Sequence, residues 1–387
     1  QDRVRKIRTV DIFEFVLQLA KNRSEGAQTI LNMMYSEKNM LSKKVLKSSM
    51  SEARDKVVVN MWNQVIHDIS KSLRKNIKSR RYFAIDGTVI ALQNADFDGD
   101  YKKKNSSYVP HGYGSVLYDI DYQFPIDVIL EGHCDERSLA IRHLDHLEKG
   151  DVVIMDRGYY SKKLFSEFTR KGVHVVFRMK SNTSKEEWKD DSNDIITSKD
   201  SIDCRFVKYN VNNTKYMLLT SLLDKTENTS EFVQMLYKKR WSIETQYGYV
   251  KNTCSLANLH ARTVDHLQEE FSANFLLYSI SRLLEYHSIN KSSYDVVGGE
   301  FNRNVLINNN VRGKHNLKVN FKNCISLVNK YLHKILSDDI ENIFEDLLEY
   351  IMIGLVGIRE NRKFPRISIT PINRWNLQRS ANLRDSK

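Results

Sequence analysis

The chain has 387 residues, of which 60 are Lys or Arg and 48 are Asp or Glu, so its formal net charge is +12 and its sequence pI is near 9.3. This length suffices for two or three domains, and 41% hydrophobic residues with a mean hydropathy of −0.50 argue against a membrane protein. The longest apolar runs, such as residues 351–358, end well short of the ~20 residues that a membrane-spanning helix needs.

Four cysteines, at positions 134, 204, 254 and 324, are far apart and form no CxxC pair. This spacing excludes a zinc ribbon and disfavours a disulfide scaffold. The first residues, Gln1-Asp2-Arg3, show no apolar signal region. We therefore expect an intracellular protein in a reducing compartment.

The basic charge is concentrated at the two ends of the chain. Residues 1–80 hold 17 basic and 8 acidic residues, a net charge of +9, and residues 359–387 hold 8 basic and 2 acidic residues, a net charge of +6. The centre therefore carries −3. Two basic segments around a slightly acidic body indicate a polyanionic partner, although a soluble protein with basic tails would have the same pattern.

Residues 9–78 are predicted to be helical. Apolar residues recur at helical spacing after Ile12, Ser24 to Gly26 interrupt the pattern, and a third segment runs from Ser51 to Ile69. Three short helices in a basic region fit a helix-turn-helix bundle, and a helical oligomerisation domain fits equally well.

From residue 82 onward the pattern changes to strands mixed with helices. Strands are predicted at 82–85, 115–122, 127–131, 152–155 and 173–179, with helices at 138–147 and 162–171. Strands followed by alternating helices and strands predict a mixed α/β sheet.

Residues 180–228 are polar and contain strand-like pieces at 204–211 and 216–220. A single long helix is predicted over residues 230–252. The rest of the chain to residue 357 is predicted to be mostly helical, with an Asn-rich break at 302–316.

Two aspartates follow apolar strands. Asp86 comes after Tyr82 to Ile85 and Asp156 after Val152 to Met155, and each precedes a glycine by one or two residues. We expect both at strand ends where the chain turns, so that they can converge on Mg²⁺ or Mn²⁺. Each acid taken alone is also typical of a turn or cap, so the pair needs a third member.

The predicted helix over 230–252 supplies a third acid. Tyr237, Arg240, Glu244 and Lys251 are spaced so that they share one helical face. This stripe offers a metal ligand, an Arg fork for a phosphate, a Lys charge and a hydroxyl. A solvated, salt-bridged face is the alternative interpretation. The acids Asp135 and Glu136, with His133, could assist the site, but turn residues explain them as well.

The three motifs together resemble those of DDE transposases of the insertion sequence four group. They are Ala84-Ile-Asp86-Gly-Thr88, Ile154-Met-Asp156-Arg-Gly-Tyr-Tyr-Ser161, and the helix with Tyr237, Arg240, Glu244 and Lys251. The 88 residues between Asp156 and Glu244 leave room for the β-rich insertion of such enzymes. The segment Lys47 to Arg54 is similar to the start of a helix-turn-helix in relatives.

The resemblance implies an α/β fold, namely an RNase H-like mixed sheet with a β-rich insertion. The catalytic domain would span residues 81–179 and 229–285, interrupted by the insertion at 180–228. A helical DNA-binding region at 1–80 would precede it. A helical C-terminal region at 286–387 with a basic tail would follow. We expect dimer contacts in its helices, where the acidic stretch Asp338 to Glu349 could face a basic patch on a partner.

The resemblance also implies a cut-and-paste transposase that acts through hairpin ends. Asp86, Asp156 and Glu244 would bind two Mg²⁺ or Mn²⁺ ions that serve both hydrolysis and strand transfer. The residues expected to contact DNA are Tyr237, Arg240, Lys251 and Arg157. Trp188 is expected to be the platform on which a flipped base stacks.

The partners implied by the resemblance are double-stranded DNA, both terminal inverted repeats and target, and a second copy of the chain in a homodimer. No membrane partner is expected, and the protein would be DNA-associated, in a bacterial cytoplasm or a nucleus. Two other interpretations stay open, a structure-selective nuclease with the same fold and a domesticated transposase that only binds DNA.

Overall fold

The structure is a computed structural model. It describes residues 7–21, 26–38, 44–74, 80–92, 97, 99–101, 109–199, 201–211, 213–254, 256, 259–292, 317–337 and 340–357.

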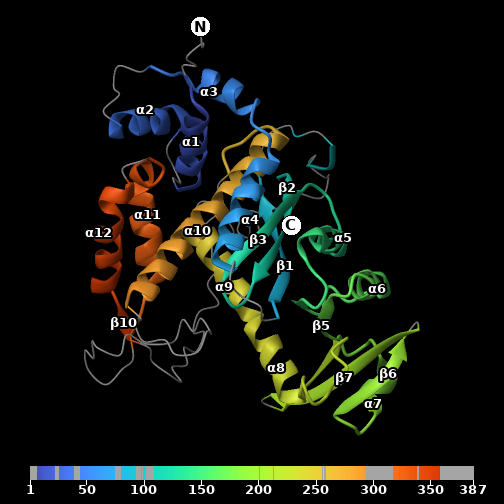
Figure 1. Cartoon of the computed structure of the whole chain (residues 1–387). Coiled ribbons are helices and arrows are strands. Elements are labelled where there is room, and N and C mark those ends of the chain that lie inside the picture. Colours follow the sequence, from blue (N-terminus) through green and yellow to red (C-terminus); the bar gives the residue numbers. More distant parts are fainter. Residues whose placement is uncertain are drawn as a thin grey trace, which may run out of the picture.

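An eight-stranded mixed sheet forms the centre of the molecule (Figure 1). Its first five strands are β1 (Tyr82–Ala91), β2 (His111–Asp119), β3 (Phe124–Glu131), β4 (Val152–Met155) and β5 (His174–Arg178), in the order β3-β2-β1-β4-β5. β1, β2 and β3 are antiparallel neighbours, whereas β4 runs parallel to both β1 and β5. This meander followed by parallel strands is the RNase H-like arrangement that was predicted.

The segment after β5 extends the same sheet. It contains α7 (Lys185–Lys189), β6 (Asp194–Lys199), β7 (Ile202–Val211) and β8 (Thr214–Thr220). β8 pairs antiparallel with β5, and β7 and β6 follow outward. The expectation of a β-rich insertion is confirmed. Strand β6 was not predicted, because it has no fully buried residue and therefore no run of buried apolar residues.

Helices cover both faces of the central strands. Residues of β1 alternate between two hydrophobic clusters, with Phe83 and Ile85 in one and Ala84 in the other. The first cluster is closed by α5 (Glu136–Arg142), the short η2 (His143–His146) and α6 (Lys162–Arg170). The second lies against α10 (Val264–Ser292) and α4 (Asn60–Arg74), on the opposite side in Figure 1. The 3-10 turn η1 (Gly99–Tyr101) lies between β1 and β2.

The N-terminal part of the described chain contains four helices where three were predicted. They are α1 (Thr9–Lys21), α2 (Ala27–Glu37), α3 (Lys47–Arg54) and α4. The predicted helix over 51–69 is wrong, because the chain leaves the helix at Asp55 and restarts at Asn60. Three consecutive valines, residues 57–59, lie in this break, and β-branched side chains lose rotamer freedom in a helix.

The C-terminal half is mostly helical, as predicted. Its elements are α8 (Ser230–Lys239), α9 (Trp241–Asn252), α10, β9 (Leu317–Lys318), α11 (Phe321–Ile335), α12 (Ile340–Ile353) and β10 (Val356–Gly357). α10 has 29 residues and crosses the molecule between the sheet and the outer helices (Figure 1).

The single helix predicted over 230–252 is instead two helices that meet at Arg240. At this junction the amide of Arg240 donates to the carbonyl of Tyr237, and the amide of Ile243 donates to the carbonyl of Arg240. Each bond spans three residues rather than four, which tightens the turn and separates α8 from α9.

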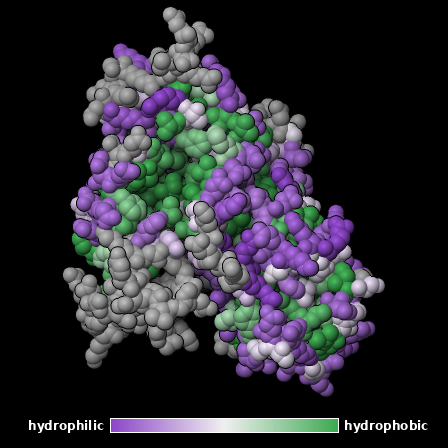
Figure 2. All heavy atoms as spheres, viewed as in Figure 1, coloured by the Kyte–Doolittle hydropathy of each residue, from purple (hydrophilic) through white to green (hydrophobic). Residues whose placement is uncertain are grey.

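An apolar hollow of about 340 Å³ lies where the N-terminal helices meet the C-terminal ones. Its lining comes from α1, α4, α10, α11 and α12, and Figure 2 shows hydrophobic side chains gathered there. The two ends of the chain thus share one hydrophobic core with the inner face of the sheet.

Two predictions fall outside the described residues. They are the Asn-rich break at 302–316 and the basic tail at 359–387. Within the described ranges, no helix has the length and apolar character needed to cross a membrane.

Candidate active site

Asp86 and Asp156 lie side by side at the point where two parallel strands part. β1 pairs with β4 only from Tyr82 to Ile85, and the last pair is Ile85 with Met155. Both acids come directly after this last pair. The sequence therefore places them at one edge of the parallel region, as predicted.

The prediction that Asp86 ends its strand is wrong. β1 continues to Ala91 because β2 remains paired with it, with Asp86 opposite Val116 and Gly87 opposite Ser115. Antiparallel pairing over this stretch supplies backbone hydrogen bonds that a short apolar run does not reveal. Asp86 is consequently held by a rigid strand, whereas Asp156 begins the loop after β4.

The junction of α8 and α9 brings Glu244 to the two aspartates through Arg240. The Arg240 Nη2 atom donates to Glu244 Oε1 at 2.6 Å, and its Nη1 atom lies 3.7 Å from Asp86 Oδ2. On the same face, the Tyr237 hydroxyl donates to Asp156 Oδ1 at 2.9 Å. The structure thus brings together the three acids predicted from the sequence, together with Tyr237 and Arg240.

Burial and neighbouring charges give the two aspartates different acidities. Burial raises the pKa of Asp86 to about 6; Arg240 opposes this rise, while Glu244 and Asp156 add to it. For Asp156, burial also acts upward, but hydrogen bonds from the Arg157 amide and the Tyr237 hydroxyl outweigh it, so its pKa is lowered.

Lys251 lies farther along α9 and also faces the site. Burial lowers the pKa of Lys251, and the charge of Asp86 acts against that decrease. Its ammonium lies 5.7 Å from the centre of the Tyr247 ring, and the Tyr247 hydroxyl donates to the Asp86 carbonyl at 2.8 Å. Lys251 is therefore a further cation near Asp86.

The donor set fits a hard divalent cation in its chemistry. The Asp86 and Glu244 carboxylates pair with one guanidinium, and the charge of Asp156 also acts on it. Carboxylate oxygens are the ligands that Mg²⁺ and Mn²⁺ prefer. The Nε atom of Arg240 is buried without a hydrogen-bond partner. Among the described residues, no three acidic, His or Cys side chains lie close enough to hold one ion. Arg240 takes the central position between the acids.

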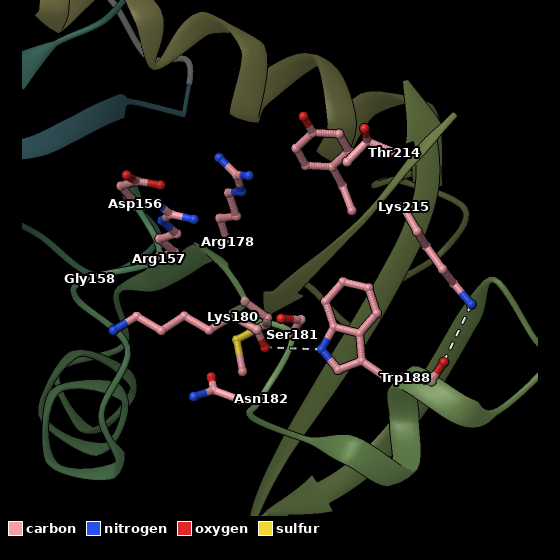
Figure 3. A pocket seen from close by; sticks show the side chains of 12 residues that line it. Asp156, Arg157, Gly158, Arg178, Lys180, Ser181, Asn182, Trp188, Thr214 and Lys215 are labelled. Carbon is pink, nitrogen blue, oxygen red and sulfur yellow. Dashed lines mark hydrogen bonds between the residues drawn. The ribbon is translucent and has the colours of Figure 1, made fainter. Parts of the chain in front are cut away.

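A basic pocket of about 740 Å³ opens beside Asp156. Figure 3 shows Arg157 and Arg178 on the side of Asp156, with Trp188 and Lys215 on the opposite wall. Arg157, predicted to contact DNA, is exposed and lines this pocket. The basic lining of the pocket suits an anionic ligand.

Trp188 is a wall of this pocket and is only partly buried. Its indole nitrogen donates to the Lys180 carbonyl at 3.1 Å, and the Lys215 ammonium donates to the Trp188 carbonyl at 3.4 Å (Figure 3). The ring packs at the edge of the α5–α6 hydrophobic cluster. Trp188 is thus held in place with one part still open to the pocket.

Sequence reasoning missed several side chains at this site. Arg178 ends β5, and its guanidinium lies 4.7 Å from the centre of the Tyr216 ring. Trp241 begins α9, directly after Arg240, and is 60% exposed. Arg178 could have been found from the sequence, because it is a basic residue at the end of a strand predicted next to the one before Asp156. Nothing in the sequence pattern indicated that Trp241 faces solvent.

A second polar constellation lies inside the protein. Ser115 Oγ is 3.0 Å from His143 Nε2, and His143 Nδ1 is 2.6 Å from Asp127 Oδ2. His143 is 0% exposed and Ser115 is 1% exposed, so no substrate reaches the hydroxyl. This Ser-His-Asp arrangement ties β2, β3 and η2 together, and Asn63 of α4 also donates to Asp127.

Comparisons with known proteins agree with this geometry. Residues 77–280 match the family described as the transposase DDE domain. The chain is 23% identical over 287 residues to a protein of Synechocystis sp. named as a transposase for insertion sequence element IS4SA, covering 71% of this chain and 82% of that protein. Among solved structures, the chain is similar to piggyBac transposase in a synaptic complex with hairpin DNA, with 11% sequence identity and a TM-score of 0.48. The match covers 94% of this chain and 79% of the piggyBac chain.

Proposed function

The chain belongs to the family of transposases with a DDE domain, and from that premise we propose that it excises a mobile element by cutting at both ends and inserts it by strand transfer. Membership makes it an enzyme that cleaves and joins DNA, in the insertion sequence four group. The cut-and-paste route and the residue roles below are our proposal.

The observation that carries the proposal is the approach of Asp86, Asp156 and Glu244 to one another around Arg240. The three acids come from β1, the loop after β4 and α9, so only the folded chain gathers them. Buried acids without a matching number of cations are costly unless a ligand compensates their charge.

We assign Asp86, Asp156 and Glu244 as the ligands of two Mg²⁺ or Mn²⁺ ions. The chemistry that these ions supply when bound is activation of a water molecule or a DNA 3′-hydroxyl and stabilisation of the leaving oxygen. The protein side chains do the positioning. Tyr237 fixes the Asp156 carboxylate through its hydroxyl, and the rigid strand fixes Asp86.

Arg240, Lys251 and Arg157 are assigned to phosphates near the cut. Arg240 has a planar fork that matches a phosphate, and a DNA phosphate that approaches would compete with Glu244 for it. Such an exchange would free the Glu244 carboxylate for its role as a metal ligand. Lys251 supplies a point charge next to Asp86.

Trp188 is assigned as the platform for a base flipped out of a hairpin end. The support is its position in the basic pocket beside Asp156 and its fixed indole. Stacking of a base on an aromatic ring is worth about 1–3 kcal/mol, and Arg178 and Lys215 would hold the flanking phosphates.

The partners in this proposal are the element's terminal inverted repeats, target DNA and a second copy of the chain. The basic N-terminal region, with its net charge of +9, would supply salt-sensitive affinity for DNA. Arg54 is excluded from that surface because it is buried against α10. The protein would act inside the cell, on the DNA that carries the element.

An integration assay tests the proposal. The full chain is incubated with DNA that carries the element's terminal repeats, a supercoiled target plasmid and Mg²⁺, and joined products are expected. Glu244→Gln should abolish cleavage but keep DNA binding, and Glu231→Gln, an exposed acid on α8, should retain both activities. Cleavage without joining would point to a nuclease instead, and binding without cleavage would point to a DNA-binding protein.

A further inference from the structure

Tyr247 of α9 contacts the strand residue that carries the first acid. Its hydroxyl donates to the backbone carbonyl of Asp86 at 2.8 Å. β1 is already paired with β2 at this point, with Asp86 opposite Val116, and a carbonyl oxygen has a second lone pair that can accept another donor. The sheet does not depend on the Tyr247 hydroxyl, so what this hydrogen bond fixes is the position of α9 on β1.

The side chain of Tyr247 is buried and does not face a substrate. Tyr247 is 6% exposed, and its ring meets that of Phe275 in α10 edge to face, with 6.2 Å between the ring centres. Burial and the charge of Asp86 hold the pKa of Tyr247 well above its ordinary value. The hydroxyl therefore keeps its proton and remains a hydrogen-bond donor to Asp86.

Glu244 and Lys251 share one face of α9 with Tyr247. Glu244 comes three residues before Tyr247 and Lys251 four residues after it, and residues at these spacings are neighbours on a helix surface. The Lys251 ammonium indeed lies 5.7 Å from the centre of the Tyr247 ring. A shift of α9 across β1 would therefore move the third acid and this lysine together.

Two polar contacts tie α9 and the residue before it to Asp86 in the described part of the chain. One is the Arg240 guanidinium, 3.7 Å from the Asp86 carboxylate, and the other is the Tyr247 hydroxyl. In the proposed function a DNA phosphate competes for Arg240, so the first contact weakens when DNA binds. The second contact reaches a backbone carbonyl from a buried side chain, so DNA leaves it in place.

We infer that Tyr247 is a positioning residue for DNA cleavage, whose hydroxyl keeps Glu244 next to Asp86 once DNA has engaged Arg240. The inference rests on the proposed function, which assigns both acids to the divalent ions. Tyr247 contacts neither the DNA nor the ions, and it acts through the placement of α9 on β1.

Tyr247→Phe tests the inference, because it removes the hydroxyl and keeps the ring. The full chain is mixed with saturating terminal-repeat DNA, and the cleavage rate is measured as Mg²⁺ is titrated. The Mg²⁺ concentration that gives half the maximal rate should rise about tenfold, as when a group that orients metal ligands is removed, and the Kd for DNA should not change. Mn²⁺ binding to the complex with pre-cleaved ends, followed by electron paramagnetic resonance of free Mn²⁺, should weaken by the same factor.

Tyr249→Phe is the matched control. Tyr249 lies on the same helix, but its ring meets Phe321 of α11, with 4.9 Å between the ring centres. Its variant loses the same group and should change neither the Mg²⁺ requirement nor the Mn²⁺ affinity. The melting temperature of metal-free Tyr247→Phe should stay close to that of the unmodified chain.

A lower melting temperature in Tyr247→Phe with unchanged Mg²⁺ requirement and Mn²⁺ affinity would make the hydroxyl purely structural. Weaker DNA binding with unchanged Mn²⁺ affinity would make Tyr247 a DNA contact. Either result overturns the inference and leaves the proposed function intact. If the unmodified chain neither cleaves terminal-repeat DNA nor binds Mn²⁺ with it, the proposed function and the inference both fail.

Discussion

Arg54 joins the N-terminal helices to α10 through a buried ion pair, and we predict that its removal destabilises the whole chain. Arg54 is 6% exposed, and Glu269 and Glu270 are each 1% exposed. The Arg54 Nε atom donates to Glu269 at 2.9 Å, and its Nη2 atom lies 3.4 Å from Glu270. Replacing Arg54 by Met would leave two buried carboxylates side by side.

The stability lost in Arg54→Met comes mainly from the unpaired Glu269 carboxylate. Glu270 keeps the amides of His260 and Ala261 as donors, at 2.6 and 3.2 Å, whereas Arg54 is the side-chain donor to Glu269. Breaking one side of a buried pair costs about 3–5 kcal/mol, and Arg54→Met should lower the free energy of unfolding by that amount. Urea denaturation followed by circular dichroism at pH 8 measures it.

The loss in free energy of unfolding caused by Arg54→Met should depend on pH. Burial raises the pKa of Glu269, and Arg54 now opposes that rise, so loss of Arg54 would raise it further. As the pH falls below this raised pKa, Glu269 becomes protonated in the folded variant and no longer leaves an unpaired buried charge. The difference in free energy of unfolding between Arg54→Met and the unmodified chain should therefore shrink between pH 8 and pH 5. Replacing Glu269 by Leu in the same chain should restore part of the stability, because an apolar pair can replace a buried ion pair.

Arg170→Met is the control, since Arg170 forms an exposed pair with Glu167. Exposed pairs contribute about 0–1 kcal/mol, so little change is expected. If Arg54→Met costs no more than this control, the reasoning about the buried pair is wrong.

Three further outcomes are expected. His143→Leu should lower the melting temperature by removing a buried hydrogen-bonded ring, whereas Ser115→Ala should keep DNA cleavage, which a hydrolytic role for the hydroxyl would forbid. Burial acts to raise the pKa of Asp194, but hydrogen bonds from Arg205, Ser230 and Lys225 lower it to about 2, so Asp194→Asn should lower the free energy of unfolding above about pH 4. Because Asp194 is partly exposed the loss should be small, and it should shrink toward zero as the pH falls from 4 to 2, which urea midpoints across these pH values measure. Trp188→Ala should abolish the 2-aminopurine signal of a flipped base in hairpin DNA, whereas Trp241→Ala should alter only DNA affinity; the reverse result would move the platform to Trp241.

The sequence predicted the strands and acids that depend on local pattern. Four buried apolar residues in a row defined β4 as it is found, and the acid after it followed. The reach of β1 past Asp86 was not predicted, because it is set by pairing with β2, some thirty positions along the chain. Pairing between distant segments leaves little trace in a single strand's composition.

The same limit applies to the site. Spacing alone placed Tyr237, Arg240 and Glu244 on one face, but their contacts required the tight turn at Arg240. No role was predicted for Tyr247, because its contact with the Asp86 carbonyl depends on how α9 packs across the sheet. Contacts between segments are fixed by packing, and the sequence shows them only when a motif repeats a known arrangement.

The pairing of β8 with β5 has a mechanical consequence. Backbone hydrogen bonds from Val176 to Arg178 join the wall of the basic pocket to the strands that carry the acids. In the proposed function, a nucleotide held in that pocket and the phosphate next to Asp156 would therefore both rest on one sheet. Strand spacing would then set the distance between them, so the position of the cut relative to the held nucleotide would not depend on the DNA sequence in between.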